Sequence, residues 1–167
     1  MGGHIMRISI LFFVFFVFAD LNLRAYNAPQ TFDRSRFYSV MASGKVDDIN
    51  NEIAIVSSSE TSYKEGYEGA LLMRKAGLLK IPAEKLKYFK RGRTKLETAL
   101  LNDKDNAEYH FLRLTIQEHA PKIVKYHDQL ETDKEYIKKS FKNLPLVVQQ
   151  AIINYSAGSK VLNPQDL

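Results

Sequence analysis

Polar side chains of one predicted helix, over residues 107–119, are the first candidates for chemistry in this sequence. They are Glu108, Arg113, Gln117 and Glu118. Arg113 and Gln117 lie four residues apart and therefore share a helix face, from which Arg113 can reach a carboxylate on a neighbouring helix. We interpret these residues as a buried, hydrogen-bonded set that fixes helix packing. A polar pocket that holds a ligand is the alternative.

Cations dominate one face of another predicted helix, which begins at Pro82 and runs to about Leu101. At about 100° per residue, four of them occupy the side opposite the apolar stripe, and these are Lys87, Lys90, Arg91 and Lys95. Such a face could dock on an acidic partner, an anionic lipid headgroup or another polyanion. The alternative is an ordinary solvated face, because long cationic side chains cover an amphipathic helix at little cost.

Side chains for covalent or metal chemistry are scarce. The chain has no cysteine, which excludes thiol catalysis and thiolate metal sites. Its histidines do not show the spacing of zinc hydrolases, and no serine-nucleophile motif, phosphate-binding glycine loop or dinucleotide fingerprint is present. We therefore expect no cofactor, no metal and no catalytic residue, and a non-enzymatic binding or scaffold protein. The alternative is a small helical enzyme acting on glycans or cell wall, with Glu108 or Glu118 as a buried general acid without a cationic partner.

Residues 1–25 have the pattern of a secretory signal peptide. Arg7 precedes an unbroken apolar run over residues 8–18, and Ala25 offers a small residue for cleavage. The run is too short for a comfortable membrane span, which needs about 20 apolar residues. We predict cleavage after Ala25, and cleavage after Ala19 or an uncleaved anchor are the alternatives.

Charge and composition narrow the class of partner. Removing Arg7, Arg24 and Asp20 with the signal peptide leaves 22 basic and 18 acidic residues. This net positive charge is too small for a dedicated nucleic-acid binder. A small exported domain without cysteine is typical of bacteria, because exported eukaryotic domains of this size commonly depend on disulfides. We expect a periplasmic or secreted protein that binds an envelope protein or peptide, with no transmembrane segment after cleavage. Binding to an anionic surface through the basic face is a further alternative.

Apolar residues at helical spacing, separated by short turns, predict a single all-α domain over residues 33–160. We expect an antiparallel array of seven or eight helices, with a linker at 26–32 and a flexible tail at 161–167. The predicted helix boundaries are Asp33, Gly44, Asp47 or Asp48, Pro82, Asp105 or Asn106, Pro121, Asp133, Pro145 and Gly158. Gly66 and Gly69 predict the close approach of a neighbouring helix, and the helix at 107–119 is expected at the centre.

The turn before residue 107 resembles a junction of the tetratricopeptide repeat family. The matching residues are Ala99-Leu100, the turn Asp103-Lys104-Asp105-Asn106, Ala107-Glu108 opening the next helix, and Pro121 where the second helix of a repeat begins. Lys104 replaces the turn proline of the family, and Leu114 stands where the family has a small residue. The resemblance covers residues 84–120, with no period of about 34 residues along the chain. It implies a helical-repeat-like scaffold that binds proteins or peptides in a concave groove.

Overall fold

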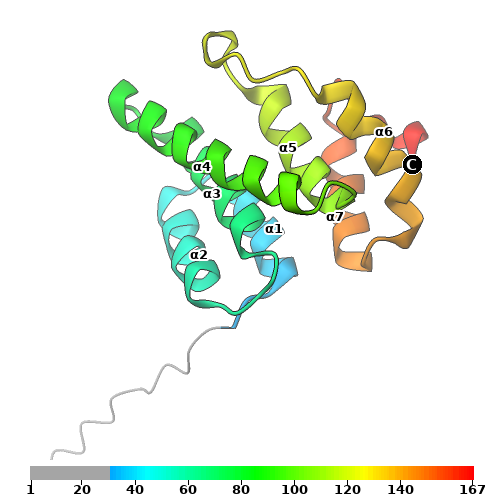
Figure 1. Ribbon diagram of the computed structural model, residues 1–167, viewed down its shortest axis with the longest axis horizontal. Helices are drawn as coiled ribbons and strands as arrows, with labels where there is room; N and C mark the ends of the chain where they lie inside the picture. The colour runs from blue at the N-terminus through cyan, green and yellow to red at the C-terminus, as the bar shows by residue number, and fades with distance from the viewer. Residues whose placement is uncertain (1–30) are drawn as a thin grey trace, which may run out of the picture.

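The computed structural model describes residues 31–167, which fold into helices without any strand (Figure 1). The α-helices are α1 (Arg34–Ser43), α2 (Val46–Ser58), α3 (Lys64–Leu78), α4 (Pro82–Asn102), α5 (Ala107–His119), α6 (Leu130–Ser140) and α7 (Leu146–Ser156), with 3₁₀ segments at Lys122–Val124, Phe141–Asn143 and Pro164–Asp166. The predicted all-α class is confirmed. The predicted signal peptide, its cleavage site and most of the predicted linker lie outside the described residues.

Several helix ends fall where the sequence predicts them. Asp33 caps α1, because its side chain accepts a backbone hydrogen bond from the first turn at 2.7 Å. Gly44 ends α1 with a φ of 67°, a left-handed conformation that glycine adopts at little cost. Pro82 is the first residue of α4, and the side chain of Asn106 caps α5. These ends follow from local chemistry within a few residues of sequence.

Helices α3 and α4 lie against each other, and two glycines let their backbones approach. A Cβ atom at Gly69 would lie 2.6 Å from the backbone nitrogen of Leu96, and one at Gly92 would lie 2.5 Å from the carbonyl oxygen of Gly69. Only glycine fits at both positions without a backbone shift. Gly66 is also restricted, by the ring of Tyr109 on α5. The predicted role of Gly66 and Gly69 in close helix approach is confirmed.

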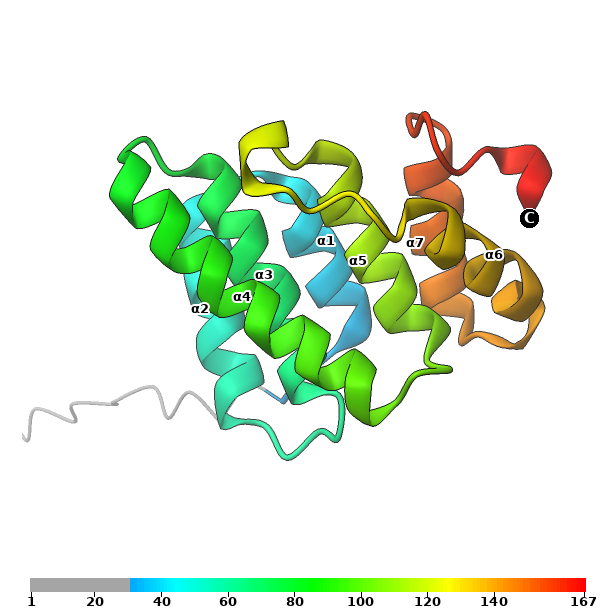
Figure 2. The ribbon, with the colours of Figure 1, turned by 45° about the horizontal axis from the view of Figure 1, so that its top comes forward.

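Helix α5 lies at the centre of the fold, as its sequence predicts (Figure 2). Its Tyr109, Leu112 and Ile116 side chains belong to a core shared with α1, α2, α3 and α4. Its Phe111 and Leu114 side chains belong to a second core shared with α6 and α7. Because neighbours cover α5 on several sides, four of its polar residues are buried, and these are Glu108, His110, Arg113 and Gln117.

Two predicted helix caps are wrong. The sequence predicts Asp47 or Asp48 as the cap of α2, but Lys45 holds that position and both aspartates lie in the first turn. There, their negative charges interact favourably with the positive end of the helix dipole. Asp133 is predicted as the cap of the next helix, but α6 begins at Leu130 and Asp133 is fully buried inside it. The side chains of Arg113 and His110, both on α5, contact the Asp133 carboxylate there.

The chain on either side of α6 and α7 also differs from a simple series of helices. Pro121 is predicted to begin an α-helix, but only the three-residue segment Lys122–Val124 follows. Lys125 ends that segment with a left-handed φ of 46°. Residues 161–167, predicted as a flexible tail, lie against the second core, with Leu162 fully buried. The flexibility of this tail stays a prediction.

Candidate functional site

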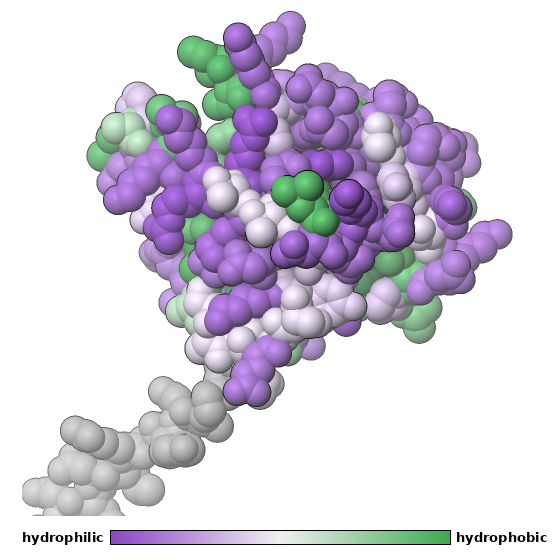
Figure 3. All heavy atoms as spheres, viewed as in Figure 1, coloured by the Kyte–Doolittle hydropathy of each residue, from purple (hydrophilic) through white to green (hydrophobic). Residues whose placement is uncertain are grey.

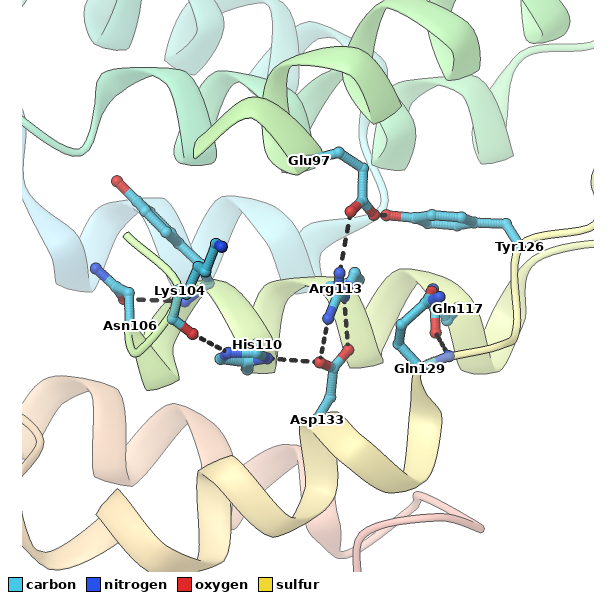
Figure 4. A network of polar contacts seen from close by, with 10 residues as sticks. Glu97, Lys104, Asn106, His110, Arg113, Gln117, Tyr126, Gln129 and Asp133 are labelled. Carbon is cyan, nitrogen blue, oxygen red and sulfur yellow. Dashed lines mark hydrogen bonds and ion pairs between the residues drawn. The ribbon is translucent and has the colours of Figure 1, made fainter. Parts of the chain in front are cut away.

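A polar cluster joins α4, α5 and α6 around Arg113 (Figure 4). Arg113 donates two hydrogen bonds to the Asp133 carboxylate on α6, from Nη2 at 2.7 Å and from Nε at 2.9 Å. A third hydrogen bond runs to Glu97 on α4 at 3.0 Å. The forked arginine–carboxylate geometry is among the strongest polar contacts in proteins. Arg113 thus reaches carboxylates on two neighbouring helices, α4 and α6, where its position in the sequence predicts one.

His110 extends this cluster toward the turn before α5. Its Nδ1 lies 2.6 Å from the Asp133 carboxylate, and its Nε2 lies 2.8 Å from the carbonyl oxygen of Lys104. The His110 ring stacks on Tyr136 of α6 with ring centroids 4.0 Å apart. Both ring nitrogens therefore face oxygen acceptors, and Asp133 is held from two directions. Sequence reasoning missed His110 and Asp133, although the three-residue spacing of His110 and Arg113 places both on one helix face.

Gln117 and Tyr126 hold the connection between α5 and α6 onto the same cluster. The Gln117 side chain donates to the side chain of Gln129 at 2.6 Å and accepts the Gln129 backbone N–H at 3.3 Å. The Tyr126 hydroxyl donates to Glu97 at 2.5 Å. Burial, together with the hydrogen bond to Glu97, raises the pKa of Tyr126, so the phenol remains a donor. Each buried polar side chain of the cluster has a hydrogen-bond partner within it.

Glu108 lies at the other end of α5 from Gln117 and faces α1 and α3. The hydroxyl groups of Tyr38 and Tyr67 each donate to its carboxylate at 2.8 Å, and Arg34 lies 3.4 Å away. Burial and the nearby carboxylate raise the pKa of both tyrosines, so both remain protonated donors. The structure therefore does not bring Glu108 together with Arg113.

Glu118, near the carboxyl end of α5, belongs to a third environment. Its carboxylate accepts hydrogen bonds from the hydroxyl groups of Ser159 at 2.6 Å and Tyr155 at 2.5 Å, and from the backbone N–H of Lys160 at 2.6 Å. Burial alone would raise the pKa of Glu118, but these hydrogen bonds outweigh burial and lower it. A general acid needs the opposite shift. The geometry of both Glu108 and Glu118 favours a structural role.

The four cations predicted as one basic face of α4 differ in their surroundings. Lys87, Lys90 and Arg91 are exposed, whereas Lys95 pairs with two glutamates of α3 at 3.0 and 3.3 Å. Burial lowers the pKa of Lys95, but the two carboxylates outweigh burial and raise it. Lys90 lines the groove described next, and the other three do not.

A groove of about 1460 Å³ crosses the molecule along the carboxyl-terminal half of α5. α5 contributes the apolar side chains of Phe111, Leu112 and Ile116, and the remaining lining comes from α1, α3, α4, α7 and the Lys122–Val124 segment. Small-molecule pockets usually measure about 300–1000 Å³, so this groove suits a longer segment. Sequence reasoning missed the groove, because its lining comes from helices far apart in the chain.

The charged side chains that line the groove are all basic. They are Arg74, Lys85, Lys90 and Arg93, and no aspartate or glutamate is among the lining residues. Arg74 donates to a carbonyl oxygen of α1 at 2.8 Å, and Arg93 lies over the ring of Tyr126. Lys85 and Lys90 are exposed and enter no ion pair within residues 31–167. The groove thus combines apolar surface with cations that are free to meet an acidic group.

Comparison of the chain with known protein families, curated proteins and solved structures finds no match. Within the described part of the chain, no three side chains of the metal-ligating types are grouped so that they could hold a metal ion. No helix between residues 31 and 167 has the length and apolar character needed to cross a bilayer. The candidate site with the clearest geometry is therefore the groove.

Proposed function

We propose that this protein is a non-enzymatic binding module, exported to the bacterial envelope, whose groove holds a segment of a partner protein. The observation that carries the proposal is the groove itself, a mainly apolar recess of about 1460 Å³ built from α1, α3, α4, α5 and α7. Extended apolar surface is uncommon on a soluble monomer and marks interaction sites.

Helix-in-groove recognition is the binding mode that fits this geometry. In that mode, apolar residues at positions i, i+3, i+4 and i+7 of a partner helix enter an apolar recess. The tetratricopeptide resemblance at residues 84–120 predicts the same class of function, and the predicted signal peptide directs the protein to the envelope. The two carboxylates named for an enzymatic alternative, Glu108 and Glu118, are both engaged in hydrogen bonds.

Filling the groove tests the proposal. Gly77→Trp adds a large ring at a groove-lining position where a Cβ atom meets no other atom, so the fold should persist. Leu146→Trp is the matched control, because Leu146 is exposed on α7 outside the groove. Residues 26–167 with either change would be used to capture proteins from an envelope extract, followed by mass spectrometry and direct titration of the retained protein.

We expect a partner that binds the parent chain and Leu146→Trp with equal affinity. It should bind Gly77→Trp at least roughly tenfold more weakly. Equal binding by all three chains would place the partner outside the groove. A parent chain that retains no partner saturably would overturn the proposed function.

A further inference from the structure

Exposed aliphatic side chains stand on both sides of the groove mouth. Ile81 and Leu86, at the amino end of α4, are 57% and 46% exposed, and Ile123, in the Lys122–Val124 segment, is 88% exposed. Leu86 and Ile123 both line the groove, so the fold brings them to one surface from distant parts of the chain. Figure 3 shows hydrophobic side chains at these two projecting ends, over the amino end of α4 and over the 3₁₀ segment.

Lysines lie close in sequence to each of these aliphatic side chains. In the sequence, Lys80 and Lys85 flank Ile81, Lys85 and Lys87 flank Leu86, and Lys122 and Lys125 flank Ile123. None of these lysines enters an ion pair within the described residues. Residues 80–93 hold six basic residues and one acidic residue, so this stretch carries a net charge of +5, equal to that of the whole chain. Positive charge is concentrated where the aliphatic side chains are exposed.

Exposed aliphatic side chains next to unpaired lysines complement an anionic bilayer, which has charged headgroups above an apolar acyl region. Ammonium groups are attracted to anionic headgroups, and aliphatic side chains between them leave water for the acyl region. A soluble polyanion would attract the same lysines but would leave Ile123 in water. The combination of charge and exposed aliphatic surface therefore favours a lipid surface.

We propose that this end of the molecule docks on an anionic lipid surface, with Leu86 and Ile123 inserted among the lipids and the groove mouth facing the membrane. The docking surface consists of Lys80, Ile81, Lys85, Leu86, Lys122, Ile123 and Lys125. Lys85, Leu86 and Ile123 of this surface also line the groove, so docking and partner capture are tested with separate variants. Docking goes beyond the proposed function and can fail or succeed separately.

Vesicle sedimentation tests the docking surface. Residues 26–167 are used, because the two cores of the described part of the chain run from Phe37 to Leu162 and the apolar run at 8–18 would itself partition into lipid. We expect at least roughly tenfold tighter binding to phosphatidylcholine vesicles with about 30% phosphatidylglycerol than to phosphatidylcholine alone, since lysines near an anionic surface each contribute roughly fivefold. Binding should weaken as salt rises from about 0.05 M to about 0.5 M. Equal binding to the two vesicle types would overturn the proposal.

Paired variants separate the aliphatic contribution from charge. Ile123→Ser leaves the charge unchanged and should weaken vesicle binding roughly tenfold, through lost apolar burial. Leu146→Ser is the matched control, because Leu146 is 82% exposed and lies outside the groove lining. Lys85→Glu together with Lys122→Glu should weaken binding at least as much, whereas Lys142→Glu, at an exposed position outside the groove lining, should not. Equal effects of Ile123→Ser and Leu146→Ser would show that the aliphatic tips do not insert.

Tryptophan fluorescence gives a direct readout of insertion, because the chain contains no tryptophan. Ile123→Trp should shift its emission to shorter wavelengths with anionic vesicles and should be quenched by brominated acyl chains. Leu146→Trp should show neither change. A soluble polyanion such as heparin in place of vesicles should leave the emission of Ile123→Trp unshifted. An equal shift with heparin would reassign the surface to polyanion binding. Gly77→Trp protein, with the groove filled, should still sediment with vesicles, which distinguishes docking from partner capture.

Discussion

Around Arg113 the buried charges meet opposite charges, whereas the cations along the groove enter no ion pair within residues 31–167. Asp133 is fully buried and contacts Arg113 and His110, and Arg113 in turn reaches Glu97. The groove-lining Lys85 and Lys90 remain exposed and unpaired.

The difference separates charges that hold the fold from charges that are available to a partner. Removing a charge from water is costly unless an opposite charge and hydrogen bonds replace the water. An exposed lysine keeps its hydration and needs no partner. Pairing at the α4–α5–α6 junction therefore offsets the cost of burying these charges, and unpaired cations at the groove cost the fold little.

Breaking the Arg113 cluster should have the largest effect. Asp133→Asn leaves Arg113 and His110 buried without their anion, so we expect a loss of about 3–5 kcal/mol in the free energy of unfolding. Urea denaturation followed by circular dichroism measures it. Asp128→Asn, at an exposed position before α6, is the matched control and should change stability by less than about 0.5 kcal/mol. A loss below about 1 kcal/mol for Asp133→Asn would contradict the role of the cluster in holding α6 on α5.

Glycine substitutions extend the comparison from charge to packing. Gly92→Ala places a Cβ atom 2.5 Å from the carbonyl oxygen of Gly69, so we expect a loss of about 1–3 kcal/mol from overpacking. Gly77→Ala is the same substitution in the groove wall, where a Cβ meets nothing within 4 Å. It should instead stabilise α3 by about 0.5–1 kcal/mol, because alanine favours helix over glycine. Thermal or urea denaturation should therefore show that the two substitutions change the free energy of unfolding with opposite signs. Equal losses of stability would mean that the groove wall is as tightly packed as the α3–α4 contact.

Glu118 predicts a pH dependence of intermediate size. Its pKa is lowered in the folded chain, so its stabilising contribution is complete above the ordinary value of 4.5 and is lost as pH falls through the lower, folded value. Glu118→Gln should reduce the free energy of unfolding by about 1 kcal/mol at neutral pH, through weaker hydrogen bonds. The gap between parent and variant should narrow as unfolding is measured at progressively lower pH below 4.5. If the difference in unfolding free energy between parent and variant stays constant with pH, the three hydrogen bonds do not act by stabilising the charged carboxylate.

Reversing the groove cations should have the smallest effect on stability. Lys85→Glu with Lys90→Glu should change the free energy of unfolding by less than about 0.5 kcal/mol, since exposed and unpaired charges contribute little to the fold. The same variant should bind anionic vesicles more weakly, because Lys85 belongs to the docking surface. Destabilisation comparable to that of Asp133→Asn would remove the distinction between the two regions.

Helix ends illustrate what local sequence can predict and where it fails. Asp33, Gly44, Pro82 and Asn106 act through groups within about four residues of themselves, and each has the predicted place. Asp133 looks like a local cap in the sequence, yet its partner Arg113 lies 20 residues away. The cap prediction failed because a long-range ion pair outweighed the local preference.

The sequence by itself determined the all-α class, the central position of α5 and the close contact at Gly69, because side-chain spacing and size act locally along a helix. Only the tertiary structure decided which carboxylates Arg113 meets and that Glu108 and Glu118 lie in separate environments. It also decided that Leu86 and Ile123 share one surface at the groove mouth. The spacing of apolar residues predicts where helices lie along the chain, whereas ion pairs and grooves depend on how separate helices pack in space.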